Sequence, residues 1–287
     1  MSESTAVTRT QLADFVDLDF ARRLEMAETI LPDCYESLRQ YGPKDPIALL
    51  KVAGGYAFCG GPDYPVNQVV GMGLYGEVAA KDLDEAEEFF RSRGVPSAVV
   101  LSPLADESLR NLLGERGYGI AEFNSVLIRR IQPGEPFSPP EGISIERVIP
   151  ETAGEWMATI AKGFEQDIVV AESVFGGFAA LPGATAFTAS IEGKVVGGAG
   201  GRIIPEARIA ALFGTATLPE YRGRGVQTAL IARRLHEASL HGCEYAVVST
   251  HPGSGSQRNM ERRGFRVAYT KTVMMRRWPE LEKPDGH

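Results

Sequence analysis

At 287 residues the chain is long enough for two domains of ordinary size, each with its own hydrophobic core. Its apolar fraction of 44%, its charged fraction of 23% and its net charge of −7 are typical of a soluble globular protein. No apolar run approaches the roughly 20 residues that span a bilayer, and no basic patch interleaved with aromatic residues indicates nucleic-acid binding.

The segment Met1–Thr10 is polar and does not resemble a signal peptide, which favours a cytoplasmic protein with no membrane or nucleic-acid partner. The three cysteines, Cys34, Cys59 and Cys243, are widely spaced and form no Cys-x-x-Cys pair. We therefore expect buried thiols, and neither a disulfide framework nor a metal site.

One sequence pattern occurs twice along the chain. Each copy predicts a helix, a short apolar strand, a helix that ends at glycine and an extended pair of strands. In the first copy the leading helix is expected at 82–93. The matching positions are 93–100 with 241–248, Ser108 with Ser256, Asn111 with Asn259, 116–118 with 263–265, and 126–130 with 273–277. We interpret the pattern as an internal duplication.

A segment rich in proline and glycine, residues 131–142, separates the two copies. It holds four prolines and two glycines in twelve residues, which no helix or central strand would tolerate. We therefore expect a first domain at 1–130, a linker at 131–142 and a second domain at 143–287.

The second copy is preceded by elements of its own. The expected order is a strand at 143–148, helical segments between 152 and 180, antiparallel strands at 184–192, 194–204 and 208–217, a helix at 225–241, a strand at 244–250, a helix at 255–263, and the pair of strands within 266–277.

A glycine-rich turn, residues 219–227, joins the apolar strand 208–217 to the next helix. Gly223 and Gly225 lack Cβ atoms, so the backbone can curl until successive N–H groups point into one concavity. The first turn of the helix adds unpaired N–H groups and the positive end of the helix dipole, while Arg222 and Arg224 add charged donors. This pattern predicts a pyrophosphate site, and a plain strand-to-helix turn is the alternative.

The turn fits neither the dinucleotide fingerprint nor the nucleoside triphosphate loop. It resembles the acyl-CoA loop of the GNAT superfamily of N-acetyltransferases, Arg/Gln-x-x-Gly-x-Gly/Ala: Arg222 and Gly225 match, whereas Gln227 stands where that family has Gly or Ala. The element order over 143–277 is also that of a GNAT domain. In the first copy, residues 71–81 lack Arg-Gly-x-Gly, which predicts a degenerate copy without cofactor binding.

The resemblance implies an α/β (α+β) protein with two tandem GNAT-like domains, each a mixed, mainly antiparallel twisted sheet with flanking helices. It also implies acetyl-CoA as acyl donor, no metal, and a backbone N–H near Ala216 to Leu218 that donates to the thioester oxygen. The expected cofactor contacts are Ala216, Thr217, Leu218, Arg222, Gly223, Arg224, Gly225, Val226, Gln227, Ser256 and Asn259. Capping or packing is an equal alternative for Ser256 and Asn259, because Ser108 and Asn111 persist in the copy without the loop.

Two catalytic residues common in GNAT enzymes are absent. The strand 208–217 has no carboxylate, and Met260 stands at the position of the tyrosine that protonates the thiolate. We expect His251 to act as the general base, with an ordinary turn residue as the alternative, and Glu165 and Asp167 to contact the acceptor.

The predicted function is acetyl-CoA-dependent N-acetyl transfer to a primary amine of a small molecule or peptide, by direct attack in a ternary complex. The missing Glu and Tyr favour the alternative of a non-catalytic module that binds or senses CoA or acyl-CoA, and a third interpretation is a scaffold adaptor. The identity of the acceptor and the choice between monomer and homodimer stay open.

Overall fold

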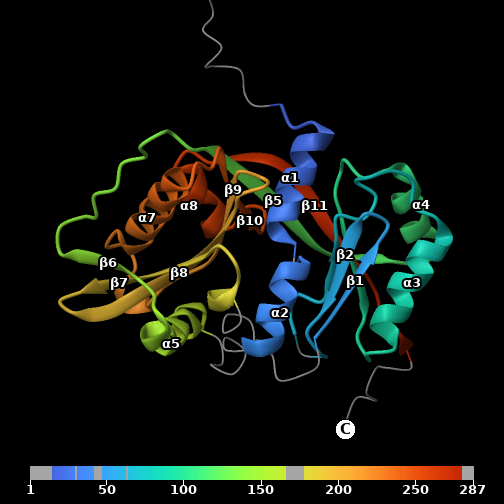
Figure 1. Ribbon diagram of the computed structural model, residues 1–287, viewed down its shortest axis with the longest axis horizontal. Helices are drawn as coiled ribbons and strands as arrows, with labels where there is room; N and C mark the ends of the chain where they lie inside the picture. Colours follow the sequence, from blue (N-terminus) through green and yellow to red (C-terminus); the bar gives the residue numbers. More distant parts are fainter. Residues whose placement is uncertain (1–14, 30, 42–46, 63, 166–177, 280–287) are drawn as a thin grey trace, which may run out of the picture.

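The computed structural model of the protein describes residues 15–29, 31–41, 47–62, 64–165 and 178–279 (Figure 1). Its helices are α1 (Leu18–Glu28), α2 (Pro32–Tyr41), α3 (Ala80–Arg91), α4 (Glu107–Glu115), α5 (Ala153–Phe164), α7 (Val226–Leu240) and α8 (Gly255–Glu261). Its strands are β1 (Ala48–Val52), β2 (Gly55–Cys59), β3 (Gln68–Val70), β4 (Ser97–Leu101), β5 (Gly119–Arg130), β6 (Ile143–Arg147), β7 (Ala184–Ile191), β8 (Lys194–Ile204), β9 (Ile209–Thr217), β10 (Tyr245–Thr250) and β11 (Arg266–Arg276).

All the described strands belong to one eleven-stranded sheet in the order β1-β2-β3-β4-β11-β5-β10-β9-β8-β7-β6. The pairs β3–β4 and β9–β10 are parallel, and the other pairs are antiparallel. This largely antiparallel sheet with flanking helices confirms the predicted fold class. The segment β4-α4-β5 also has the same element order as β10-α8-β11, as expected for the two copies.

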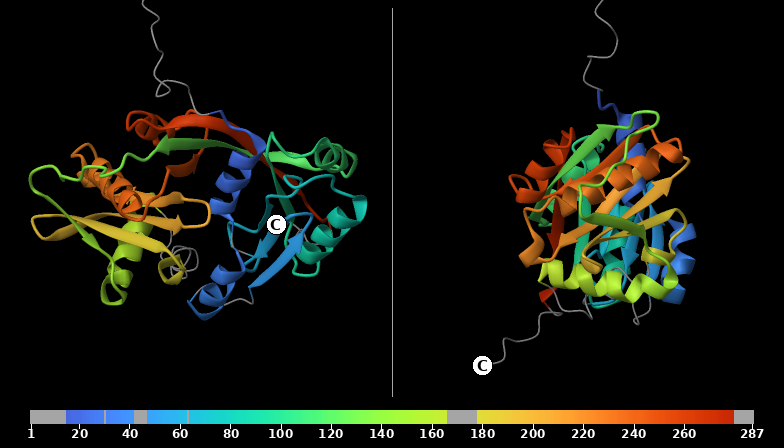
Figure 2. Two further views of the ribbon diagram at one scale, coloured as in Figure 1. Left: turned by 45° about the horizontal axis from the view of Figure 1, so that its top comes forward. Right: turned by 90° about the vertical axis from the view of Figure 1, so that its left-hand side faces the viewer.

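The two copies exchange their last strands, which sequence periodicity did not predict. Instead of a pair of strands, each copy ends in one long strand. β11 of the second copy pairs with β4 of the first, β5 of the first copy pairs with β10 of the second, and β5 and β11 pair with each other. Figure 2 shows these two strands running side by side across the middle of the molecule. The sheet therefore continues without a break from one copy to the other.

The helices divide between the two faces of the sheet. Residues of α7 and α8 pack with Ala210, Leu212 and Ala246, whereas residues of α1 pack with Ile209 and Ala211. Because successive strand residues point to opposite faces, α1 covers the face opposite to α7 and α8. Figure 1 shows α1 between the half of the sheet that holds β1 to β4 and the half that holds β6 to β8.

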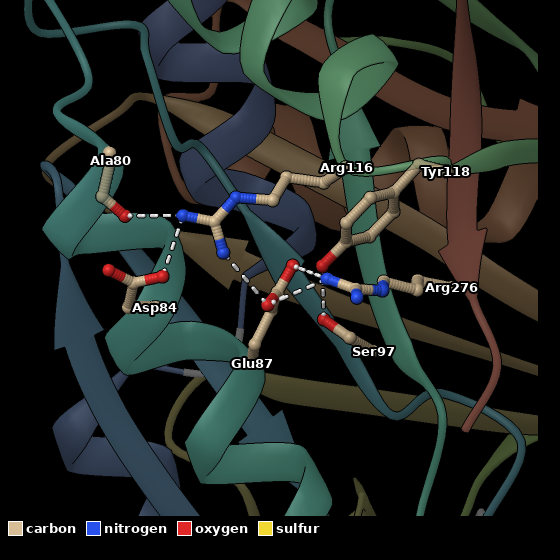
Figure 3. Close-up of polar contacts among 7 residues, drawn as sticks. All are labelled: Ala80, Asp84, Glu87, Ser97, Arg116, Tyr118 and Arg276. Carbon is tan, nitrogen blue, oxygen red and sulfur yellow. Dashed lines mark hydrogen bonds and ion pairs between the residues drawn. The ribbon is translucent and has the colours of Figure 1, made fainter. Parts of the chain in front are cut away.

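A buried carboxylate fastens the exchanged strand β11 to the first copy. Glu87 on α3 accepts hydrogen bonds from Arg276 on β11 at 2.9 and 3.0 Å and from Arg116 at 3.2 Å (Figure 3). Arg116 also pairs with Asp84 at 2.6 Å. Two arginines therefore share one carboxylate whose side chain is 10% exposed, and Arg116 has Asp84 as a second partner.

Replacing Glu87 by alanine is expected to destabilise the protein by about 2–4 kcal/mol, because both guanidinium groups lose their shared partner in a poorly solvated place. Urea denaturation measures the change in the free energy of unfolding. Glu88→Ala changes the exposed neighbour on the same helix and is expected to stay within about 0.5 kcal/mol of the wild type. Equal effects of the two substitutions would contradict this role of Glu87.

The three cysteines are free and buried, as expected. Burial raises the pKa of both the Cys34 and Cys243 thiols to about 11, which keeps them protonated near neutral pH. Within the described residues, no helix has both the length and the apolar character that a membrane crossing requires.

Candidate functional site

The glycine turn has the backbone geometry that its sequence predicts. Gly223 has φ +80° and Gly225 φ +88°, both in the left-handed region, and Gly225 is the N-cap of α7. A Cβ at Gly223 would meet nothing within 4 Å, and one at Gly225 would first meet Pro140 at 3.6 Å. These glycines are therefore required by backbone conformation and not by lack of space.

A cleft of about 730 Å³ lies against the N-terminus of α7, and we call it the turn cleft. The predicted cofactor contacts that line it are Ala216, Thr217, Arg222, Gly223, Gly225, Val226, Gln227, Ser256 and Asn259. Arg262 and Arg263 on the far side add two positive charges that the sequence analysis did not single out. The cleft thus combines the positive end of a helix with guanidinium groups, a combination suited to an anionic ligand.

The sheet opens at one end of the turn cleft. β9 and β10 pair only from Ile209 to Ala211, with Tyr245 to Val247, although both strands continue further. β10 pairs along its whole length with the exchanged strand β5. The register between β8 and β9 also shifts between Gly198 and Gly200, which is a β-bulge. A gap therefore separates the ends of β9 and β10.

Two buried hydroxyl groups flank the gap without a hydrogen-bond partner among the described residues. They are Oγ1 of Thr217 on β9 and Oγ1 of Thr250 on β10. The N–H of Leu218 donates to the carbonyl of Val196 at 2.9 Å. Because successive N–H groups of a strand point to opposite edges, the N–H of Thr217 points away from β8 and toward the gap. The N–H of Leu218 is therefore taken up by Val196, whereas the N–H of Thr217 is oriented to donate to a ligand in the gap.

A second cavity, of about 580 Å³, lies on the other side of the gap, and we call it the central cavity. It is lined by both copies, from Ala27 and Phe58 of the first to Phe213 and Ser249 of the second. Thr215, Gln227, Ser256 and Phe164 line both spaces. The turn cleft and the central cavity therefore meet at the gap between β9 and β10.

The charged residues predicted around the turn are not all directed at a ligand. The Arg222 guanidinium donates to the carbonyl of Gly163 at 2.9 Å and lies 3.6 Å from the Glu165 carboxylate. Arg224 lies over the ring of Tyr221, 5.1 Å from its centroid, and does not line the turn cleft. Glu165 lines neither space, and Asp167 falls outside the described residues. Arg222 thus ties the turn to the end of α5.

The two copies use the same serine and asparagine positions differently. Asn259 donates to the Gln227 side chain at 2.8 Å across the turn cleft, and Ser256 lines that cleft. In the first copy, the Ser108 hydroxyl accepts a hydrogen bond from the N–H of Val78 at 2.8 Å. The equivalent serine therefore closes the turn of the first copy with a protein contact.

An acidic side chain also occupies the start of α3, the helix of the first copy that corresponds to α7. The Asp82 carboxylate accepts a hydrogen bond from the N–H of Ala79 at 2.9 Å. A carboxylate at a helix N-terminus takes the place that an anionic ligand would use. This contact agrees with the sequence of a copy that does not bind the cofactor.

His251 and Met260 both line the central cavity. Nδ1 of His251 lies 3.3 Å from the carboxylate of Glu122 on β5, and 70% of the His251 side chain is exposed. Met260 is buried at the position where the resemblance leads one to expect a tyrosine. The described wall of the central cavity also includes Glu28 of α1, which no motif in the sequence indicated.

Residues 154–265 match the family described as the acetyltransferase (GNAT) family. No curated protein sequence matches the chain. A GCN5-related N-acetyltransferase from Kribbella flavida is 17% identical, with a TM-score of 0.67, over 94% of this chain and 98% of that chain.

Two further solved structures have a similar fold. A tandem GNAT protein from the clavulanic acid biosynthesis pathway is 15% identical, with a TM-score of 0.59, over 90% of this chain and 93% of the other. A GCN5-related N-acetyltransferase from Sphaerobacter thermophilus is 16% identical, with a TM-score of 0.55, over 80% and 75%. At these identities the likeness concerns the fold.

Proposed function

Residues 154–265 are an acetyltransferase domain of the GNAT family within a chain that has the tandem GNAT fold, and from this premise we propose N-acetyl transfer from acetyl-CoA to a primary amine. The GNAT fold itself supports acyl-CoA-dependent acetyl transfer in general. The amine acceptor and the assignment of residues are our proposal.

One observation carries the proposal: the turn cleft and the central cavity meet at the gap between β9 and β10. The anionic end of the donor fits the turn cleft, where the N–H groups at the start of α7 and the Arg262 and Arg263 side chains lie. The acceptor fits the central cavity. Donor and acceptor then reach the gap from opposite sides, as direct attack in a ternary complex requires.

Acetyl-CoA, when bound, supplies an acetyl group activated as a thioester. The N–H of Thr217 points toward the gap and is placed to donate to an oxygen on which negative charge develops. The unpartnered hydroxyls of Thr217 and Thr250 offer further hydrogen bonds on either side of the gap. His251, which the sequence led us to expect as the general base, lies at the exposed rim of the central cavity.

A thermal shift with CoA and acetyl-CoA, followed by a thiolate-release assay with a panel of primary amines, tests the proposal. We expect stabilisation by both nucleotides and amine-dependent release of CoA. The absence of the tyrosine, where buried Met260 stands, favours the alternative of a binding or sensing module. Stabilisation without release for any amine would support that alternative, and no stabilisation would contradict both.

Gly163 at the end of α5 sets how closely this helix approaches β9. A Cβ there would lie 2.6 Å from Cβ of Ala216 and 3.2 Å from the backbone nitrogen of Thr217. We expect Gly163→Ala to push α5 and β9 apart, lowering the free energy of unfolding by about 1–3 kcal/mol. It should also weaken CoA binding by about tenfold, because Ala216 and Thr217, which line the turn cleft, move.

A matched control exists in the same helix. A Cβ on Gly154 would meet nothing within 4 Å, so Gly154→Ala is expected to leave CoA binding unchanged and to stabilise the helix by up to about 1 kcal/mol. Urea denaturation and calorimetric titration with CoA measure both effects. Equal CoA affinity of the two variants would contradict the role of Gly163.

A further inference from the structure

Five side chains from α1, β10 and β11 form a hydrogen-bonded group at the wall of the central cavity, which we call the acidic group. They are Glu25, Glu28, Ser249, Tyr269 and Lys271. Lys271 binds Glu25 at 2.9 Å and also binds Glu28. Tyr269 donates to Glu25 at 2.7 Å, and Ser249 donates to Glu28 at 2.5 Å. Two carboxylates therefore face one ammonium group, which leaves a negative charge at this wall.

The two carboxylates of the acidic group differ in their access to the cavity. The Glu25 side chain is 2% exposed and does not line the central cavity, whereas the Glu28 side chain is 20% exposed and does. Ser249, which donates to Glu28, lies on β10 two positions after Val247, the last β10 residue that pairs with β9. Residues two positions apart on a strand point to the same face, so Ser249 and Val247 share a face of the sheet. Glu28 therefore lies beside the gap, on the side away from the turn cleft.

The rest of the central cavity is mainly apolar. Its walls include Phe58, Phe164, Phe178, Leu181 and Phe213. The rings of Phe178 and Phe213 lie against each other, with centroids 5.1 Å apart. Such walls favour an aromatic or aliphatic body.

The two arginines that line the central cavity are held by groups of the protein. Arg202 binds Asp33 at 3.2 Å and donates to the carbonyl of Pro182 at 3.1 Å. Arg234 donates to the carbonyls of Gly200 at 2.8 Å and Leu230 at 3.2 Å, next to the β-bulge. Lys271 also lines the cavity, and Glu25 and Glu28 hold its ammonium group. The cations of this wall are therefore paired within the protein, whereas the Glu28 carboxylate is 20% exposed.

A buried hydroxyl at the gap, on the face of the sheet opposite to Glu28, also indicates a bound molecule. Oγ1 of Thr250 is buried, has no hydrogen-bond partner among the described residues and belongs to a residue that lines the central cavity. Thr250 lies on β10 directly after Ser249, at the open end of the gap, so its side chain points to the opposite face, like that of Val248, which packs with residues of α7 and α8. Buried hydroxyl groups of native proteins normally have a partner, so a bound molecule is expected to supply one.

We propose that the central cavity binds a primary amine carried on an apolar or aromatic body, and that Glu28 receives its ammonium group and takes its proton. The inference rests on the proposed acetyl transfer and adds the acceptor class and the base. The base comes from α1 of the degenerate copy, and not from the strand before the glycine turn. Glu28 is then a catalytic residue, and Lys271 and Ser249 are positioning residues that hold its carboxylate.

The proton balance of the step is complete. The Glu28 carboxylate takes one proton from the ammonium group, and the freed lone pair of the amine forms the C–N bond to the acetyl carbon. The C–S bond breaks, the sulfur leaves with its electron pair, and the second nitrogen proton goes to the thiolate. Glu28 afterwards releases its proton to water, so that an amide, CoA and one proton result.

The test compares Glu28→Gln with Glu25→Gln. Both substitutions remove one carboxylate that binds Lys271 and leave Lys271 the other, but only Glu28 lines the cavity. The first readout is calorimetric binding of 2-phenylethylamine without nucleotide. We expect Glu28→Gln to weaken binding by about tenfold or more, because an ionised partner is lost, and Glu25→Gln by less than about threefold.

The second readout is the kcat for acetylation of 2-phenylethylamine. Glu28→Gln is expected to lower it by about 100-fold or more, and Glu25→Gln by less than about threefold. With aniline, which is neutral at pH 7, the deficit of Glu28→Gln should shrink to a few-fold, because no ammonium proton has to be removed. A purely structural role of Glu28 would lower both activities alike.

Equal losses in the Glu25→Gln and Glu28→Gln variants, or unchanged binding and turnover in Glu28→Gln, would overturn the inference. So would a wild type that does not bind 2-phenylethylamine. The thermal shift with CoA, measured on the same samples, separates this failure from that of the proposed function. Stabilisation by CoA together with acetylation of some other amine leaves acetyl transfer standing and rejects this acceptor class.

Discussion

Replacing both Gly223 and Gly225 by valine is expected to lower the affinity for CoA by about 30- to 1,000-fold. Both residues have φ near +80 to +90°, where a residue with a Cβ costs about 1–2 kcal/mol. The variant either bears about 2–4 kcal/mol of strain or abandons the curl that points the N–H groups into the turn cleft. Calorimetric titration with CoA measures the loss of affinity.

The matched control is the double replacement by asparagine, which adopts the left-handed conformation more readily than other residues that carry a Cβ. Because the space around both glycines is open, side-chain clashes are not expected in either variant. The asparagine variant should therefore keep its affinity for CoA within about fivefold of the wild type. If the valine variant folds and binds CoA as the wild type does, the turn does not hold the diphosphate.

Replacing Lys271 by methionine is expected to lower the free energy of unfolding by about 3–5 kcal/mol, measured by urea denaturation at pH 7. The Lys271 side chain is 6% exposed and Glu25 is 2% exposed, so the substitution leaves a buried carboxylate without its cation. The matched control is a triple variant that combines Glu25→Gln, Glu28→Gln and Lys271→Met, so that all three charges are removed. It should recover most of the stability, because no buried charge remains unpaired.

The same lysine predicts a pH dependence of the wild type. Burial alone lowers the pKa of Lys271, but the carboxylates of Glu25 and Glu28 outweigh burial and hold that pKa above its ordinary value. The folded state therefore binds the proton more tightly than the unfolded chain. This stabilisation is complete below about pH 10, near the ordinary lysine pKa, and is lost as the pH rises further. If deprotonation of Lys271 lowered the free energy of unfolding between pH 7 and 9, the pKa of Lys271 would not be raised, and this assignment would be wrong.

Local sequence patterns were sufficient for most of the fold. The glycine turn, the neighbouring strands 184–192 and 194–204 and the bounds of α7 depend on residues close together in the chain, and each prediction agrees with the structure within one or two residues. The exchange of β5 and β11 depends on which edge each strand meets. Two long strands with similar patterns can pair within a copy or between copies, so periodicity does not decide between them.

The candidate site shows the same limit. The turn residues could be singled out because one short segment combines two glycines with two arginines at the start of a helix. Glu28 and Lys271 lie 243 positions apart, and no spacing in the sequence brings them together. Arg222 lines the turn cleft, as expected for a cofactor contact, but the sequence did not indicate that its guanidinium also donates to the carbonyl of Gly163 on α5, 59 residues away.

The reciprocal pairing of β5 and β11 makes the two copies inseparable. If the chain were cut between residues 130 and 143, the second copy would lose the strand that holds β10 away from β9, and β11 would have two open edges. Such a fragment would aggregate or recruit the missing strand from another molecule. The first copy therefore has to keep its last strand, because the position of β10 and the gap beside β9 depend on it.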